Sequence, residues 1–260
     1  MIAKVANSII YGPVPSWRLG RSLGIDLLSH KAKTCNFNCV YCQLSETVNP
    51  VTQRGEFTSL AQLTEELKGV RGIAADYVTF SGTGEPTLAS NLGQAIEIAK
   101  STLNLPVAVL TNSSLISRED VRHDLAKADV VVATVEAHTQ ELFRQINRPV
   151  TALLLTDILE GIKLFRREFE GKLCLEVMFI KLNENFAGEI AQVVKLLSPD
   201  QVQLNTPLRP CTVKPLTPSQ MNLIKGEFVK LGDVITVYEV SRPEVTPLNL
   251  KETLRRRPKG

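Results

Sequence analysis

Three cysteines lie close together near the N-terminus, and their spacing is typical of a metal cluster. Cys35, Cys39 and Cys42 form a C-x3-C-x2-C pattern with no fourth cysteine nearby. Cysteine thiolates hold iron–sulfur clusters, and a cubane cluster normally takes four of them. Three ligands would leave one iron open to another molecule. The pattern therefore predicts a cluster that takes part in a reaction.

A structural zinc site is the main alternative for this loop. Zinc accepts three cysteines and one histidine, and His30 lies five residues before Cys35. Structural zinc sites usually split their ligands into two short pairs, whereas these cysteines fall in one run. The spacing favours the cluster and leaves a zinc-stabilised binding protein as the alternative. The remaining cysteines stand alone, and we interpret Cys174 as a core residue and Cys211 as an inert thiol.

A glycine-rich turn is the second polar motif. It has the sequence Ser-Gly-Thr-Gly-Glu-Pro at residues 81–86. Its two glycines let a ligand approach the backbone closely. The turn has neither the lysine of a phosphate-binding G-x-x-x-x-G-K loop nor the G-x-G-x-x-G spacing of a dinucleotide site. Alone, the turn is a weak signal for a binding site, and a tight strand-to-helix connection is the favoured interpretation.

From residue 22 onward, short apolar runs alternate with longer helical stretches. The expected strands are Leu23–Leu28, Tyr77–Ser81, Val107–Thr111, Val130–Val135, Leu173–Ile180, Val202–Asn205 and Val234–Val240. Helical segments are expected near 59–69, 91–102, 118–127, 139–146, 152–169, 185–197 and 217–231. Repeated βα units with apolar strands predict a parallel sheet covered by helices. Our expected fold is an α/β incomplete (βα)6 TIM-like barrel with a C-terminal helix and an extra strand, although a flat doubly wound sheet has the same order of elements.

The polar motifs follow the expected strands. In parallel βα folds, binding residues gather beyond the carboxyl ends of the strands. The cysteine loop follows the first expected strand and the glycine-rich turn the second, and Asn112, Glu136 and Arg209 follow later ones. We therefore expect them on one rim. Arg209 and its neighbour Lys214 are expected either to bind a substrate carboxylate or phosphate or to be solvated.

Composition and charge are those of an ordinary globular protein. The chain has 260 residues, of which 43% are hydrophobic, and no apolar run is long enough to cross a membrane. The N-terminus lacks the pattern of a secretory signal, and five cysteines form a poor disulfide framework, so we expect a cytoplasmic protein. Residues 1–240 are expected to form one domain, and residues 241–260 a basic, solvated tail. The last ten residues hold five basic groups and one acidic group, which leaves residues 1–250 with a net charge of −1.

Together, these motifs resemble the radical S-adenosylmethionine (SAM) superfamily. In that superfamily C-x3-C-x2-C binds a [4Fe-4S] cluster, and a G-G-E-P-like turn after the second strand contacts the methionyl amino group. The resemblance covers roughly residues 9–240. In detail, the chain is similar to the compact branch related to the wybutosine tRNA enzymes. The segments that carry it are residues 11–26, 40–44, 80–87 and 205–210.

The resemblance implies roles for individual residues. Cys35, Cys39 and Cys42 are implied to ligate the cluster, and Tyr41 to lie against the adenine. The methionyl end of SAM is implied to contact Gly82, Thr83, Gly84 and Glu85. The ribose or carboxylate is implied to face Asn112, Thr134 and Glu136. Thr83 departs from the family pattern, because a G-G-E-P turn has glycine at this position.

The resemblance also implies a reaction. An electron from the cluster cleaves bound SAM to methionine and a 5′-deoxyadenosyl radical, which abstracts hydrogen from a substrate. A low-potential electron donor is then required, and the substrate is a tRNA, a small molecule or a peptide. Such chemistry needs a closed barrel mouth. The segment Tyr11–Arg21, with Trp17 and Arg18, is expected either to cover that mouth or to pack as an N-terminal strand or plug. The separate proline-rich stretches, Tyr11–Pro15 and Asn205–Pro218, are expected to be ordered loops.

Overall fold

The computed structural model describes residues 8–28, 33–44, 46–47 and 50–258. In these residues one eight-stranded sheet has its strands in sequence order. The strands are β1 (Ile10–Ser16), β2 (Gly20–Ile25), β3 (Tyr77–Phe80), β4 (Val107–Thr111), β5 (Val130–Thr134), β6 (Lys172–Met178), β7 (Gln201–Asn205) and β8 (Val234–Thr236). Strand β1 pairs antiparallel with β2, and each later pair is parallel.

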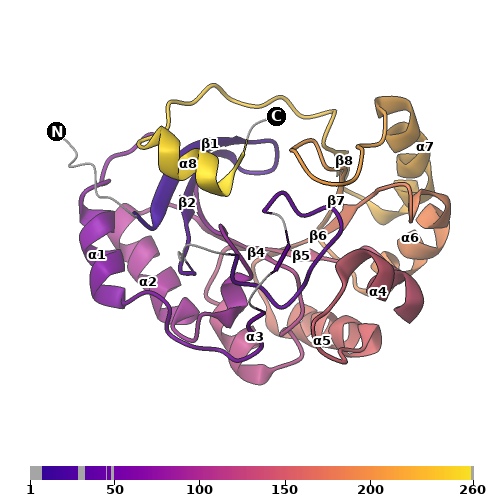
Figure 1. The fold of residues 1–260 in the computed structure, drawn as a ribbon, viewed down its shortest axis with the longest axis horizontal. Helices are drawn as coiled ribbons and strands as arrows, with labels where there is room; N and C mark the ends of the chain where they lie inside the picture. The colour runs from indigo at the N-terminus through magenta and orange to yellow at the C-terminus, as the bar shows by residue number, and fades with distance from the viewer. Residues whose placement is uncertain (1–7, 29–32, 45, 48–49, 259–260) are drawn as a thin grey trace.

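Helices form an outer arc around the curled sheet, as Figure 1 shows. They are α1 (Leu60–Lys68), α2 (Leu92–Leu103), α3 (Glu119–Leu125), α4 (Gln140–Asn147), α5 (Leu155–Glu168), α6 (Ala187–Leu196) and α7 (Pro218–Phe228), with short 3-10 turns η1 (Pro86–Leu88), η2 (Glu184–Phe186) and η3 (Val229–Leu231). Helix α8 (Leu250–Arg256) lies apart from this arc, next to β1. The spatial order of the described strands never reverses, so the sheet lacks the switch point of a doubly wound fold. The predicted partial barrel is confirmed.

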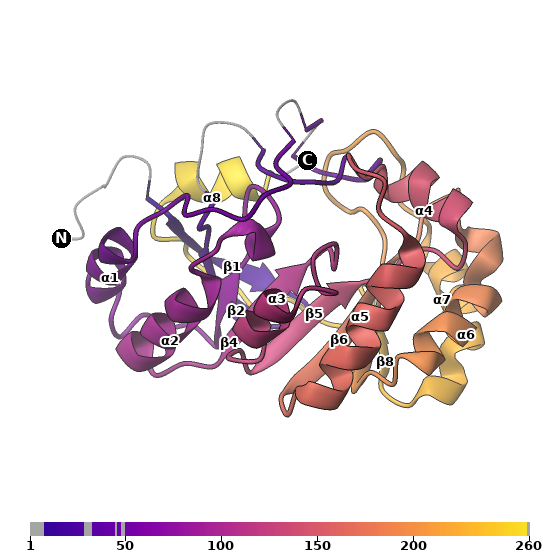
Figure 2. The same ribbon diagram turned by 90° about the horizontal axis from the view of Figure 1, so that it is seen from below.

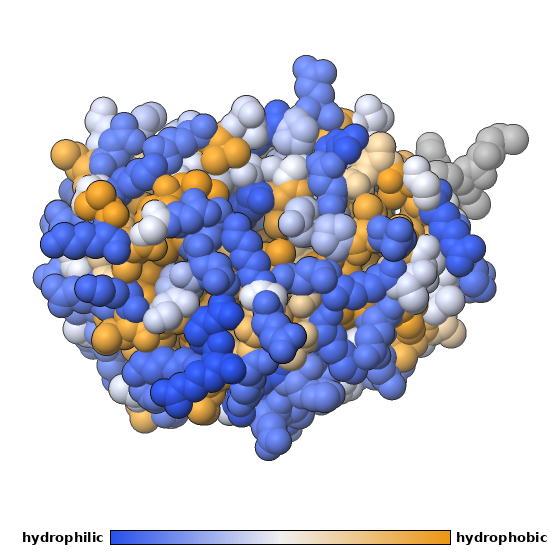
Figure 3. Space-filling view, turned by 180° about the vertical axis from the view of Figure 1, so that it is seen from behind, coloured by the Kyte–Doolittle hydropathy of each residue, from blue (hydrophilic) through white to orange (hydrophobic). Residues whose placement is uncertain are grey.

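The central strands are buried on both faces. Strands β4 and β5 are built almost entirely from valine, alanine, leucine and threonine. Such β-branched runs without polar alternation are typical of parallel strands covered on both sides. On the outer side, helix α5 buries Ile158, Ile162 and Phe165, and Figure 2 shows the helices alongside the sheet. Seen from behind, the surface is largely polar with scattered apolar patches (Figure 3).

The N-terminal segment forms the edge strand β1. The interpretation of Tyr11–Pro15 as an ordered loop was therefore wrong, and the alternative of an N-terminal strand is the one observed. Prolines are tolerated at a sheet edge because one side of the strand needs no ladder hydrogen bonds. The register with β2 also shifts between Tyr11 and Val14. Gly24 of β2 makes room for the Tyr11 ring, since a Cβ atom there would lie 2.1 Å from Cζ of Tyr11.

The C-terminal segment is not the solvated run that its charges suggested. Helix α8 packs on β1, and Figure 1 shows the chain crossing from β8 to reach it. Leu248 N donates to Gly12 O at 2.6 Å, and Gly12 N donates to Thr253 Oγ1 at 3.0 Å. The side chain of Arg256 is completely buried. The charge pattern could not reveal this, because one of the two buried carboxylates that pair with Arg256, Asp26, lies 230 positions away in the sequence.

Several strands end earlier than predicted, and polar side chains account for their ends. Asp26 Oδ1 accepts a hydrogen bond from Leu28 N at 3.2 Å just after β2, and Asn183 Oδ1 accepts one from Ile180 N at 2.8 Å after β6. Such contacts give the backbone an alternative to the sheet ladder. Among the described helices, none combines the length and apolarity needed to span a bilayer.

Candidate functional site

The cysteine loop follows β2 and lies against the C-terminal end of α4. Asn38 N donates to Asn147 O at 3.1 Å, and Val40 N donates to Ile146 O at 2.9 Å. The Phe37 ring meets Phe143 edge-on, with centroids 5.5 Å apart. These contacts hold an irregular loop on a helix end, so that the loop's shape depends on a segment about a hundred residues away.

The same loop pairs with the glycine-rich turn. Thr34 N donates to Thr83 O at 2.9 Å, and Glu85 N donates to Thr34 O at 3.1 Å. A Cβ atom at Gly84 would lie 1.6 Å from Thr34 O. Glycine is therefore required at position 84 for the two segments to approach. This pairing places Cys35 directly beside the turn.

Two side-chain amides point at the sulfur atoms. Asn112 Nδ2 lies 3.7 Å from Cys35 Sγ, and Asn147 Nδ2 lies 3.8 Å from Cys39 Sγ. Desolvation raises the pKa of the Cys35 thiol to about 11 and that of Cys39 further still. Both thiols are thus neutral as they stand, and bound iron would have to displace their protons. A soft sulfur donor set with N–H donors around it fits an iron–sulfur cluster.

Two observations bear on the zinc alternative. Within the ranges that the structure describes, no three His, Cys, Asp or Glu side chains are arranged to hold a single metal ion. A four-iron cubane differs from a single ion because each thiolate binds a separate iron. His30, the fourth ligand of the zinc alternative, lies outside the described residues.

The Glu85 carboxylate is fully engaged by the protein. Its Oε1 accepts hydrogen bonds from the backbone and hydroxyl of Thr87 and from Thr111 Oγ1, and its Oε2 accepts one from Asn112 N at 2.6 Å. Burial nevertheless raises its pKa, since desolvation outweighs these bonds. Glu85 joins the ends of β3 and β4. The groups that the turn offers to a ligand are therefore chiefly those of its backbone.

Tyr41 and Glu136 are brought together although 95 residues separate them. Tyr41 OH donates to Glu136 Oε1 at 2.6 Å, and Asn147 Nδ2 donates to Glu136 Oε2 at 2.8 Å. Burial raises the pKa of Glu136 to about 7, against the opposing effect of these two donors. Thr134 ends β5 nearby, where its carbonyl accepts from Ser113 Oγ at 3.2 Å. Asn112, predicted to face the ribose or carboxylate, has its amide on the cysteine loop.

A cavity of about 280 Å³ lies on the concave side of the sheet. Tyr41, Cys42 and Gly82 of the predicted site line it, together with Trp17 and Arg18 of the β1–β2 turn. The cysteine loop, the glycine-rich turn and the N-terminal hairpin therefore border one space. Arg209 also lines the cavity, whereas Lys214 does not.

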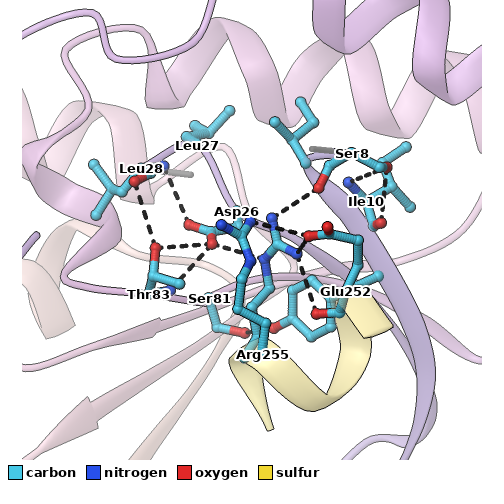
Figure 4. Close-up of polar contacts among 12 residues, drawn as sticks. Ser8, Ile10, Asp26, Leu27, Leu28, Ser81, Thr83, Glu252 and Arg255 are labelled. Atoms are coloured by element: carbon cyan, nitrogen blue, oxygen red, sulfur yellow. Dashed lines mark hydrogen bonds and ion pairs between the residues drawn. The ribbon is translucent and has the colours of Figure 1, made fainter. Parts of the chain in front are cut away.

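Asp26 connects the glycine-rich turn to α8 and lies at the centre of Figure 4. Its Oδ2 accepts hydrogen bonds from Thr83 N at 3.2 Å and Thr83 Oγ1 at 2.9 Å. The same oxygen accepts from Arg256 Nε at 2.8 Å, and Arg256 also pairs with Glu252. The threonine that departs from the family pattern is thus the residue that contacts this carboxylate.

Sequence reasoning missed Asn147, Asp26 and Glu176. Asn147 ends α4 and is 1% exposed, and no spacing links it to the cysteines. Glu176 lies in β6, pairs with Arg18 and accepts from Asn205 Nδ2 at 2.6 Å. A carboxylate inside an otherwise apolar strand was the one signal in the sequence that could have indicated it.

Comparisons with known proteins agree with this architecture. The family model described as "Radical SAM superfamily" matches residues 31–197. A UPF0026 protein of Methanocaldococcus jannaschii is 40% identical over 235 residues, which are 88% of this chain and 72% of that protein.

Solved structures share the fold. Native anSMEcpe with bound AdoMet has a TM-score of 0.63 at 19% identity, with 84% of this chain and 63% of that one covered. Streptococcus suis SuiB bound to S-adenosylmethionine has a TM-score of 0.61 at 14% identity, with 79% and 48% covered. This chain thus spans between about half and two thirds of those longer chains. The sequence matches establish that the chain belongs to the radical SAM superfamily and to the UPF0026 proteins.

Proposed function

We propose that this protein is a radical SAM enzyme whose Cys35, Cys39 and Cys42 hold a [4Fe-4S] cluster beside bound SAM. The observation that carries the proposal is the backbone pairing of Thr34 with the glycine-rich turn. It sets the first cysteine next to Gly84, while Cys42 and Gly82 border the same cavity. A cluster ligand and a turn suited to a polar ligand therefore lie at one site.

The backbone and side-chain groups of this site would each contact a different part of SAM. Backbone groups of Gly82, Thr83 and Gly84 would hold the methionyl end of SAM, and Glu85 supports the turn through its hydrogen bonds to Thr87, Thr111 and Asn112. Tyr41 would contact the adenine, and Thr134 and Glu136 the ribose or carboxylate. When bound, cluster and SAM together supply a 5′-deoxyadenosyl radical that takes hydrogen from the substrate. The protein orients both partners and excludes water.

Finer features of the proposal rest on the sequence resemblance. It links the chain to the wybutosine-related branch and implies a low-potential electron donor. A cytoplasmic setting is supported instead by the cysteine content, which forms a poor disulfide framework. A tRNA, a small molecule and a peptide are all compatible substrates at this level. Figure 1 adds that the C-terminal segment crosses the side of the barrel that the sheet leaves open.

The test is anaerobic reconstitution followed by reduction in the presence of SAM. We expect a brown protein with about four irons per chain that releases 5′-deoxyadenosine. Cys39→Ala should abolish both properties, whereas Cys211→Ala, in the loop after β7, should retain them. A complete cluster that neither binds nor cleaves SAM would refute the proposal. Colourless protein with one zinc per chain would support the zinc alternative instead.

A further inference from the structure

Positive side chains gather in the cavity beside the cysteine loop. Four arginines line it, and Glu176 supplies the one carboxylate among the lining residues, which gives a formal charge of +3. The arginines are Arg18, Arg209, Arg242 and Arg257. Residues 1–250 as a whole carry a net charge of −1. The positive charge is therefore a local property of this space.

Most of this charge has no protein counter-charge. Glu176 is already engaged by Arg18 and Asn205. Arg209 donates to the amide oxygen of Gln43 at 3.0 Å, and Arg257 donates to the hydroxyl of Ser81 at 2.8 Å, so both bind neutral partners. Across the described residues, no carboxylate forms an ion pair with Arg209, Arg242 or Arg257.

The guanidinium groups act on one another across the cavity. Desolvation by the surrounding protein, followed by the positive charges of Arg257, Arg18 and Arg242, lowers the pKa of Arg209. Arg209 and Arg242 keep contact with solvent, which screens part of this repulsion, whereas the Arg18 side chain is only 12% exposed. Like charges held in one recess repel each other, and an oxyanion relieves that repulsion through charge-assisted hydrogen bonds.

Four separate segments bring these arginines together. Arg18 comes from the β1–β2 turn, Arg209 from the loop after β7, Arg242 from the segment after β8 and Arg257 from the end of α8. Cys42 and Gly82 line the same space. An anion held here would therefore lie next to the expected reaction centre.

We infer that this cavity binds a small anionic molecule whose phosphate or carboxylate groups are held by Arg209, Arg242 and Arg257. The inference rests on the proposed function in taking that molecule to be the substrate. The size of the cavity supports a small molecule, because its volume of about 280 Å³ is slightly below the roughly 300–1,000 Å³ of most ligand pockets. A nucleic-acid site would instead show a broad basic face, and the body of this chain is nearly neutral.

Trp17 provides a built-in reporter for the test. It is the one tryptophan of the chain, it lines the cavity, and the Arg18 guanidinium lies 4.5 Å from its ring centroid. The full-length protein without cluster is titrated with pyrophosphate and, separately, with citrate while Trp17 fluorescence is recorded. We expect a saturable change with one or both anions, and the stronger response identifies phosphate or carboxylate.

A double variant and a control variant test whether the change in Trp17 fluorescence depends on the arginines of the cavity. The double variant Arg209→Gln and Arg242→Gln should raise the Kd at least about tenfold, since it removes the charge-assisted hydrogen bonds of two guanidinium groups to the anion. Arg144→Gln, on the exposed side of α4, should leave the Kd unchanged.

Unchanged fluorescence with both anions would overturn the inference, and so would a double variant that binds like the wild type. It would also be overturned by an RNA oligonucleotide that binds with this arginine dependence where both small anions fail. The titration needs neither cluster nor SAM. Protein that binds the anions, and whose complete reconstituted cluster neither binds nor cleaves SAM, would therefore refute the proposed function and leave the anion site standing.

Discussion

At the scale of single residues, the sulfur atoms of Cys35 and Cys39 each face a side-chain amide. The donors are Asn112 at 3.7 Å and Asn147 at 3.8 Å. Hydrogen bonds to cluster sulfurs stabilise negative charge and shift the reduction potential of an iron–sulfur centre. These two asparagines therefore have a task that does not require contact with SAM.

Replacing Asn112 by alanine should make the reconstituted cluster harder to reduce. Losing one hydrogen bond of about 0.5–1.5 kcal/mol corresponds to a fall in potential of about 20–65 mV for one electron. The measurement is a redox titration followed by electron paramagnetic resonance. Asn222→Ala, on the exposed face of α7, is the control. An unchanged potential in Asn112→Ala would show that the amide does not influence the cluster.

Gly84→Ala should prevent the cysteine loop from docking on the glycine-rich turn. Its Cβ would lie 1.6 Å from Thr34 O, and both atoms belong to backbone segments that cannot move independently. We expect iron content after reconstitution to fall to a small fraction of the wild-type value while circular dichroism still shows a folded barrel. Gly226→Ala in α7 meets no atom within 4 Å and should be neutral or slightly stabilising. Full iron loading of Gly84→Ala would contradict this account.

The site residues that were predicted from the sequence and those that were missed differ in how far they lie from their contact partners along the chain. Cys35, Cys39 and Cys42 lie within eight positions, so their spacing alone indicates shared chemistry. Asn147 reaches Cys39 across 108 positions, and Arg256 reaches Asp26 across 230. Contacts of that range are set by the packing of elements, and no local pattern encodes them.

At the scale of elements, a network of buried ion pairs holds α8 in position. Arg256 has a completely buried side chain that pairs with Asp26 and Glu252, and its Nη2 also donates to Ser8 O at 2.8 Å. Asp26 in turn accepts from Thr83. The helix that closes the chain is thereby connected to the turn expected to hold SAM.

Arg256→Met should destabilise the protein by about 3–5 kcal/mol, because it leaves a buried carboxylate without its partner. Chemical denaturation of the full-length protein measures this loss. Lys251→Met on the exposed side of α8 is the matched control and should change little. Adding Asp26→Asn to Arg256→Met removes the uncompensated charge and should recover part of the stability. A single variant within about 0.5 kcal/mol of the wild type would contradict the network's role.

The sequence predicted the repeating elements far better than the two ends of the chain. Runs such as Val130–Thr134 combine burial with β-branching, so periodicity identified them. Strand β1 was expected only as one of two alternatives for the N-terminal segment, because glycine and proline interrupt its pattern. Helix α8 was missed because a basic run is normally solvated, and the burial of Arg256 depends on the distant Asp26 as well as on Glu252 of the same helix.

At the scale of the whole molecule, the sheet has two edges that the C-terminal segment connects. Strands β1 and β8 end the sheet, and the chain leaves β8 and returns to pack α8 on β1 (Figure 1). The order of elements along the sequence fits a barrel and a doubly wound sheet alike. Strand neighbours decide between them, and those neighbours depend on long-range packing rather than on any single segment.

If α8 and β1 form one cooperative unit, their backbone amides should exchange hydrogen together. Leu248 N binds Gly12 O, and Gly12 N binds Thr253 Oγ1, so separation of α8 exposes hydrogen bonds of both elements. Strand β5 is flanked by paired strands on both sides and should exchange only through global opening.

Native-state hydrogen exchange on Arg256→Met separates local from global opening. We expect faster exchange in Ile10–Ser16 and Leu250–Arg256 under conditions where the amides of Val130–Thr134 keep wild-type protection, because the lost ion pairs hold the edge rather than the centre of the sheet. Lys251→Met should match the wild type throughout. If protection fell equally in all three segments, the C-terminal closure would be part of a single cooperative barrel. If α8 alone lost protection, the hydrogen bonds between the α8 segment and Gly12 would contribute nothing to the stability of β1.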